Sequence, residues 1–127
     1  MSKHSLIIRT IYAICLVPAT FTHVLLDVRY GILLGGLEPL GYPPFVRVYW
    51  AALTFLDPLA AFLLFVRPRA GLILCVAIIV TDVLNNSGVR YHRSGVDINY
   101  ILEVGFLVLV LVTVRAAWRG LPRVSSP

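Results

Sequence analysis

The sequence predicts an all-α, polytopic integral membrane protein in which four transmembrane helices form one bundle. Hydrophobic residues make up 59% of the 127-residue chain and charged residues only 13%, whereas soluble domains average roughly 45–50% and about 25%. Four apolar runs are each about 20 residues long, enough for a helix to cross the hydrocarbon core of a bilayer. We therefore treat residues 1–127 as a single membrane domain.

The expected helices are defined by these apolar runs and by the residues that interrupt them. They cover about residues 8–28, 47–66, 70–88 and 97–116, and a disordered tail is expected at 120–127. Pro18 is expected to kink the first helix, because proline leaves the Ile14 carbonyl without its intrahelical donor. The connection 30–47 is rich in Gly and Pro but keeps several leucines. We expect it to fold back on the membrane surface or to cap the bundle.

The second and third runs are joined by a tight basic turn, Arg67-Pro68-Arg69, and read as a transmembrane hairpin. A polar loop at 88–97 precedes the last run. Trp118 follows that run, at the level where tryptophan contacts lipid headgroups. The chain is therefore expected to cross the membrane four times, with short connections except at 30–47.

The basic residues predict the orientation of the bundle. With a cytoplasmic N-terminus, seven of the 11 Lys and Arg residues lie inside and four outside, as the positive-inside rule favours. The inside set is Lys3, Arg9, Arg67, Arg69, Arg115, Arg119 and Arg123, and the outside set is Arg29, Arg47, Arg90 and Arg93. We expect both termini in the cytoplasm and the chain in a bacterial inner membrane.

Polar residues occur in every predicted helix, in the half that this orientation places outside. Asp57 lies near the middle of the second run, Asp82 past the middle of the third, and Glu103 near the start of the fourth. Ionisable residues inside a membrane normally face the protein interior or a wet cavity. We expect an outward-facing acidic pocket and no polar residues in the inner half. The candidate ligand-binding residues are Asp57, Asp82, Glu103, Asn86, Asn85, Asn99, Trp50, His23 and Asp27.

Helical spacing supports a shared face for several of these residues. His23 and Asp27 are separated by one helical turn, and so are Asn99 and Glu103. Structural alternatives stay open at four places. They are an interfacial anchor for Trp50, a helix end for Asn85-Asn86-Ser87-Gly88, an interface histidine bonded to Asp27 for His23, and a hydrogen bond to Tyr12, Tyr49 or Tyr100 for Asp57.

The polar pattern suits non-covalent chemistry. Closely spaced carboxyl groups titrate as a coupled set, which suits proton exchange, acid–base catalysis or cation binding. Cys15 and Cys75 lie inside apolar runs without a redox or zinc spacing, and no spacing typical of a metal or cofactor site is present. We expect no cofactor, no metal and no nucleic-acid partner, since the basic residues flank the apolar runs.

Three functional classes follow. The leading hypothesis is binding or transport of a small amphipathic or cationic ligand, with proton exchange at Asp57 and its neighbours. The enzyme alternative is a cofactor-free isomerase that acts on a membrane lipid or sterol with paired carboxylates. The third is a non-catalytic partner or immunity-type subunit that associates with another membrane protein or with its own copies.

The stretch Leu53–Gly71 reads LTFLDPLAAFLLFVRPRAG. It resembles the passage from the second to the third helix of small four-helix DoxX-like membrane proteins. In that family an acidic residue opens an Ala- and Leu-rich half-helix, and a short Pro/Arg turn leads to the next apolar helix. The resemblance implies a four-helix membrane bundle.

Trp50 followed by Asp57 in the second helix is also similar to the EXPERA group, which includes emopamil-binding sterol isomerases. In that group, polar residues on neighbouring helices surround a lipid-like ligand. This resemblance implies that Asp57, Asp82 and Glu103 bind, or act on, a cationic or carbocation-like species.

Overall fold

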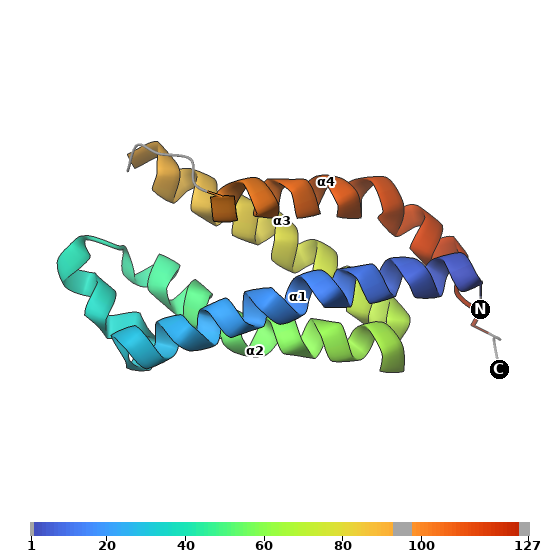
Figure 1. The fold of residues 1–127 in the computed structure, drawn as a ribbon, viewed down its shortest axis with the longest axis horizontal. Helices are drawn as coiled ribbons and strands as arrows, with labels where there is room; N and C mark the ends of the chain where they lie inside the picture. The colour runs from blue at the N-terminus through green and yellow to red at the C-terminus, as the bar shows by residue number, and fades with distance from the viewer. Residues whose placement is uncertain (1, 93–97, 125–127) are drawn as a thin grey trace.

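The computed structural model describes residues 2–92 and 98–124, and the described chain is helical with no strand. The elements are α1 (Lys3–Tyr30), the short 3-10 helix η1 (Ile32–Leu40), α2 (Pro44–Val66), α3 (Pro68–His92) and α4 (Ile98–Arg119). Each α-helix packs on the next, and α4 returns to α1 (Figure 1). Four of these helices are long and apolar enough to cross a membrane. The predicted class, an all-α bundle of four such helices, is confirmed.

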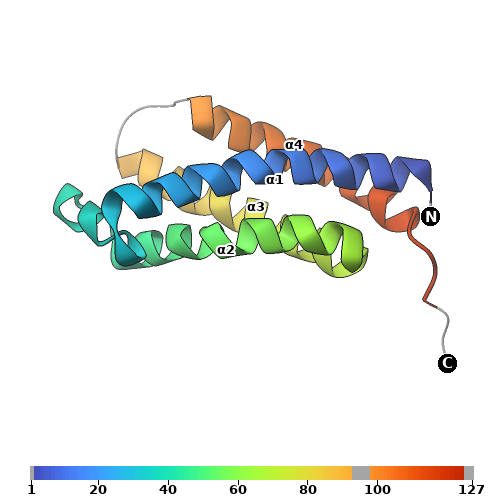
Figure 2. The ribbon, with the colours of Figure 1, turned by 60° about the horizontal axis from the view of Figure 1, so that its bottom comes forward.

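The two ends of the bundle differ in the elements that they hold. The N- and C-termini lie together at one end, which we call the terminal end (Figures 1 and 2). At the opposite end, which we call the loop end, lie η1 and the last turns of α3. The loop end is the half that the sequence predicts to face outside. Of the polar loop predicted at 88–97, residues 88–92 belong to α3, and residues 93–97 lie outside the described residues.

All four α-helices extend beyond their predicted bounds at one end or both, and the first and the third extend furthest. The first begins at Lys3, because the Ser2 hydroxyl accepts a hydrogen bond of 3.1 Å from the Ser5 N–H and caps the helix. The third continues to His92 instead of ending at residue 88. In this stretch the Asn86 and Ser87 side chains bond to other helices, so they do not compete for the backbone and end the helix.

The predicted tail is ordered over its first residues. Leu121 is buried and belongs to the main hydrophobic core. The Ser2 N–H donates to the Gly120 carbonyl at 2.9 Å, so the two ends of the chain are hydrogen-bonded to each other. The expectation of a disordered segment from residue 120 is therefore wrong at its start, because apolar burial holds Leu121 in place.

The connection after α1 folds back on α1 and α2 and caps the loop end. The chain turns at Gly31 and Gly41, which have φ angles of 80° and 82° in the region that glycine adopts most readily. Between them, Leu34 and Leu37 are buried and pack with Ala51 in a second, smaller core. This burial explains why a Gly- and Pro-rich segment keeps its leucines.

Polar groups are also buried in the inner half, contrary to the expectation from sequence. The Arg9 guanidinium is 1% exposed and donates to the Leu64 carbonyl. In a continuous helix that carbonyl would accept from residue 68, but Pro68 has no N–H. The Tyr12 hydroxyl pairs with Thr113 Oγ1 at 2.6 Å. Arg9 is among the basic residues expected on the inner side of the membrane, but its guanidinium is buried and donates to the end of α2 inside the bundle.

Candidate functional site

A network of polar side chains from all four α-helices lies in the half of the bundle toward the loop end. We call it the loop-end cluster. Its members are His23 and Asp27 on α1, Trp50, Thr54 and Asp57 on α2, Asp82 and Asn86 on α3, and Glu103 on α4. The cluster therefore combines four carboxyl groups with one imidazole, one indole, one amide and one hydroxyl.

One part of the cluster joins α1 to α2. His23 Nε2 lies 3.6 Å from Asp57 Oδ2, and the two side chains are 13% and 3% exposed. One turn further along α1, Asp27 Oδ2 accepts a hydrogen bond of 2.5 Å from Thr54 Oγ1. His23 and Asp27 also interact electrostatically. The one-turn spacing within α1 and within α2 aligns these pairs, so two contacts form side by side.

The other part of the cluster is centred on the side-chain amide of Asn86. Its Oδ1 accepts from Trp50 Nε1 at 3.0 Å. Its Nδ2 lies 2.8 Å from both carboxylate oxygens of Glu103 and 3.3 Å from Asp82 Oδ1. An amide nitrogen has two hydrogens, so at least one is shared between acceptors. A single side chain thus links α2, α3 and α4.

The two parts lie within electrostatic range of each other. Asp57 interacts electrostatically with Glu103, and Asp82 interacts with both of them. Asp57 and Asp82 are 2% and 8% exposed. The sequence places these three acids at similar depths on different helices, and the fold turns them toward a common interior.

Tyr49, one of the tyrosines considered as a hydrogen-bond partner of Asp57, belongs to this environment, although it was not among the predicted site residues. Its hydroxyl bonds to Thr81 Oγ1 at 2.5 Å, which ties α2 to α3. It also interacts electrostatically with Asp57, Asp82 and Glu103. The available signal was its position two helical turns before Asp57, which places the two side chains on one face of α2.

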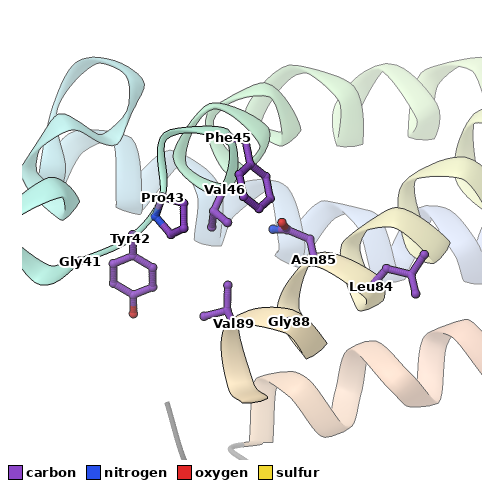
Figure 3. Close-up of a pocket in the computed structure, with 9 residues that line it drawn as sticks. All are labelled: Gly41, Tyr42, Pro43, Phe45, Val46, Leu84, Asn85, Gly88 and Val89. Atoms are coloured by element: carbon purple, nitrogen blue, oxygen red, sulfur yellow. The ribbon is translucent and has the colours of Figure 1, made fainter. Parts of the chain in front are cut away.

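Asn85 points to a different surface from that of Asn86. It lines an apolar groove of about 390 Å³ between the start of α2 and the end of α3 (Figure 3). Tyr42, Phe45, Val46 and Val89 form much of its wall. The groove therefore offers an apolar surface, and the Asn85 amide nitrogen is buried in its wall without a hydrogen-bond partner among the described residues.

The groove and the cluster are neighbours, although the acids do not line the groove. The described lining residues include Asn85 but none of the cluster's carboxyl groups. The rings of Tyr42 in the groove and Trp50 in the cluster lie 5.4 Å apart. Trp50 in turn donates to Asn86. One aromatic pair thus separates the apolar groove from the carboxyl groups.

The structure does not bring Asn99 into the cluster. It lies in the first turn of α4 and is exposed, although its spacing from Glu103 suggested a shared interior face. Trp50 is not a lipid-facing anchor, because its ring nitrogen bonds inside the bundle. Of the nine predicted site residues, seven join the cluster, Asn85 lines the groove and Asn99 does neither.

The arrangement can hold and move protons and can attract a positive charge. Carboxyl groups near one another inside a membrane repel when all are ionised, so a bound proton or cation stabilises the set. Among the described residues, no group of three or more His, Cys, Asp or Glu is placed to hold a metal ion. The chemistry that the residues themselves support is therefore acid–base and ionic.

Comparisons with protein-family models, with curated proteins and with solved structures found no match for this chain.

Proposed function

We propose that this protein binds a small amphipathic molecule with a cationic group at the loop end and exchanges protons with it. The observation that carries the proposal is the loop-end cluster itself. Asp57, Asp82 and Glu103 come from three helices and interact with one another inside an apolar bundle. Such residues are costly in a membrane interior and are retained mainly for function.

The neighbouring groove supports an amphipathic ligand over a simple ion. Its described wall is formed by apolar and aromatic residues, to which Asn85 adds a buried donor. Small-molecule sites typically combine such a wall with a few convergent polar groups. In the proposed complex, the apolar part of the ligand occupies the groove and its cationic group displaces the Tyr42–Trp50 contact to approach the acids.

Proton exchange is supported by the contact between His23 and Asp57. An imidazole and a carboxyl group 3.6 Å apart can pass a proton after a small movement, and the cluster continues from Asp57 toward Asp82 and Glu103 by electrostatic coupling. Binding of a cation at the acids then favours release of a proton, because both neutralise the same charge.

The binding test uses a dansyl-labelled alkylamine as probe and the purified protein in lipid nanodiscs. Substituting Asp57→Asn keeps the shape of the side chain but removes its charge, so the affinity for the probe is expected to fall about tenfold to a hundredfold. Glu38→Gln is the matched control, since Glu38 is an exposed acid of η1 outside the cluster. Equal affinity in wild type and Asp57→Asn would reject the proposed site.

Proton exchange is tested separately in sealed proteoliposomes that contain a pH-sensitive dye. Addition of the amine is expected to change the internal pH faster with wild-type protein than with Asp57→Asn or His23→Phe. A probe that binds tightly to wild type without any protein-dependent pH change would retain the binding site and reject proton exchange.

The isomerase alternative is favoured by one observation, the pairing of His23 with Asp57. An acid and a base in contact beside further carboxyl groups are the components of a proton-transfer isomerisation. Incubation of the purified protein with sterol or unsaturated lipid substrates tests it. A rearranged product that depends on both His23 and Asp57 would establish catalysis in place of binding alone.

We further propose that both termini face the cytoplasm of a bacterium. The excess of Lys and Arg at the terminal end supports this orientation. Cells that carry Glu38→Cys or Arg123→Cys are treated with a membrane-impermeant maleimide. Labelling of intact cells is expected for Glu38→Cys only, and Arg123→Cys should react only after permeabilisation. The reverse pattern would invert the bundle.

A further inference from the structure

A second groove lies at the terminal end, far along the bundle from the acidic cluster. It has a volume of about 460 Å³ and is formed where the α2–α3 turn meets the chain after α4. Its lining includes three arginines and three apolar residues, namely Arg67, Arg69, Arg123, Ala70, Leu121 and Val124. We call it the arginine groove. The described lining contains no acidic side chain.

Two of these arginines are available to a ligand. Arg67 and Arg123 are exposed, and their side chains have no hydrogen-bond or ion-pair partner among the described residues. Arg69 is held by two contacts to the chain at the end of α4. Its Nη2 donates to the Pro122 carbonyl at 2.8 Å, and its guanidinium lies 5.5 Å from the centre of the Trp118 ring. The groove thus has one fixed and two free guanidinium groups.

The first turn of α3 adds backbone hydrogen-bond donors to the groove. The first residue of α3, Pro68, lies in the groove, and the first turn of a helix leaves backbone N–H groups without intrahelical acceptors. The partial positive charge of this N-terminus is opposed by the C-terminus of α2 just before it, so the positive charge of the groove comes from its arginines. Arginine side chains pair with phosphate oxygens through parallel N–H groups. Together these features match a phosphate group in charge and in hydrogen-bonding capacity.

The apolar residues near the groove indicate which class of molecule carries the phosphate. The groove lies where two membrane-length helices end, beside Trp118, which is of the residue type that marks the membrane–water boundary. Exposed apolar side chains continue from it along α2, including Phe65 and Val66. A phosphate held at this level has its hydrocarbon chains beside these residues.

We infer that the arginine groove binds the headgroup phosphate of an anionic phospholipid. This inference does not depend on the function proposed for the loop-end cluster. The bound phosphodiester contacts Arg67 and Arg123 at the start of α3, Arg69 supports it from below, and an acyl chain lies along the apolar face of α2. The bound lipid joins the α2–α3 turn to the chain that follows α4.

The experiment measures retention of phosphatidylglycerol and phosphatidylcholine by the full chain, using native mass spectrometry in a zwitterionic detergent. Wild type is expected to bind phosphatidylglycerol at least tenfold more tightly than phosphatidylcholine. The variant Arg67→Gln/Arg123→Gln is expected to lose at least thirtyfold in affinity for phosphatidylglycerol, since each substitution removes a charge-assisted hydrogen bond to the phosphate. Its affinity for phosphatidylcholine should not change.

The matched control is Arg115→Gln/Arg119→Gln, which removes the same charge from exposed residues of α4 outside the groove. Its loss is expected to be below threefold. Equal losses of affinity for phosphatidylglycerol in the two double variants would show that charge alone attracts the lipid. That result would reject the arginine groove as its binding site. Full displacement of phosphatidylglycerol by millimolar glycerol 3-phosphate would contradict lipid binding and would indicate that the groove binds a soluble phosphate compound.

Discussion

The buried polar groups in the two halves of this bundle make different kinds of contact. Toward the terminal end, Arg9 donates to a carbonyl that Pro68 cannot satisfy, and Tyr12 pairs with Thr113. Each of these contacts completes a bond that folding would otherwise leave open. Toward the loop end, carboxyl groups from different helices lie near one another and interact unfavourably when ionised. Burial of polar groups thus supports the fold in one half, whereas in the other it forms the cluster that we propose as a binding site.

Close backbone packing shows the same difference. Gly71 lies in the first turn of α3, beside the end of α2. A Cβ atom at this position would overlap the backbone of Leu63 and Leu64. At the loop end, a Cβ at Gly88 would meet nothing, and this residue lines the apolar groove. The helices approach closely where the protein is held together and leave space where a ligand is proposed to bind.

The largest expected effect on stability is at Gly71. Gly71→Val should lower the free energy of unfolding by about 3 kcal/mol, because its neighbours are backbone atoms that cannot move aside. Thermal unfolding in detergent micelles measures this loss. Gly105→Val is the control, since a Cβ at Gly105 meets nothing. Similar stability for the two variants would contradict the close approach of α2 and α3.

Arg9 is expected to have the next largest effect. Arg9→Met should cost about 2 kcal/mol of unfolding free energy, because the Leu64 carbonyl then lacks a donor. The control Lys3→Met changes an exposed cation of the same helix and should be nearly neutral.

A double-mutant cycle tests the reason given for this effect. Pro68→Ala restores a backbone N–H that can pair with the Leu64 carbonyl, so Arg9→Met should cost less in the Pro68→Ala background. An identical cost in both backgrounds would mean that Arg9 acts by some route other than the missing proline donor.

Trp50 tests whether the cluster contributes to stability. Trp50→Phe removes the donor to Asn86 but keeps an aromatic ring. The expected loss is roughly 0.6 kcal/mol, the average for interhelical hydrogen bonds in a membrane protein. Urea or detergent-induced unfolding followed by circular dichroism measures it. A loss as large as that of Arg9→Met would place Trp50 among the stabilising contacts and weaken the contrast between the two halves.

Asp57 should have the smallest effect on stability and the largest on binding. Asp57→Asn removes a charge that interacts with Glu103, so the unfolding free energy should change by less than about 0.5 kcal/mol. The same preparation should lose affinity for the alkylamine probe. A variant that loses stability and binding together would indicate that Asp57 is mainly structural, held by His23.

Much of the fold can be predicted from the lengths of the apolar runs and the spacing of residues along the sequence. The length of the apolar runs predicts four membrane-length helices, and the interval between His23 and Asp27 places both on one face of α1. The depth of each residue in the membrane can also be estimated from its position in the apolar run, because each residue advances the helix by about 1.5 Å. This is why the sequence predicts that Asp57, Asp82 and Glu103 share the half of the bundle that holds the cluster.

The rotation of each helix about its axis was decided by tertiary packing. Adjacent residues of a helix point about 100° apart, so Asn86 reaches Glu103 while Asn85 lines the groove. The approach of distant segments gives Arg9 its acceptor at Leu64 and brings Arg123 beside Arg67. The sequence by itself determined which helices form and how deep their polar residues lie. Only the tertiary structure decided which of these residues meet, because that depends on how the faces of four helices fit together.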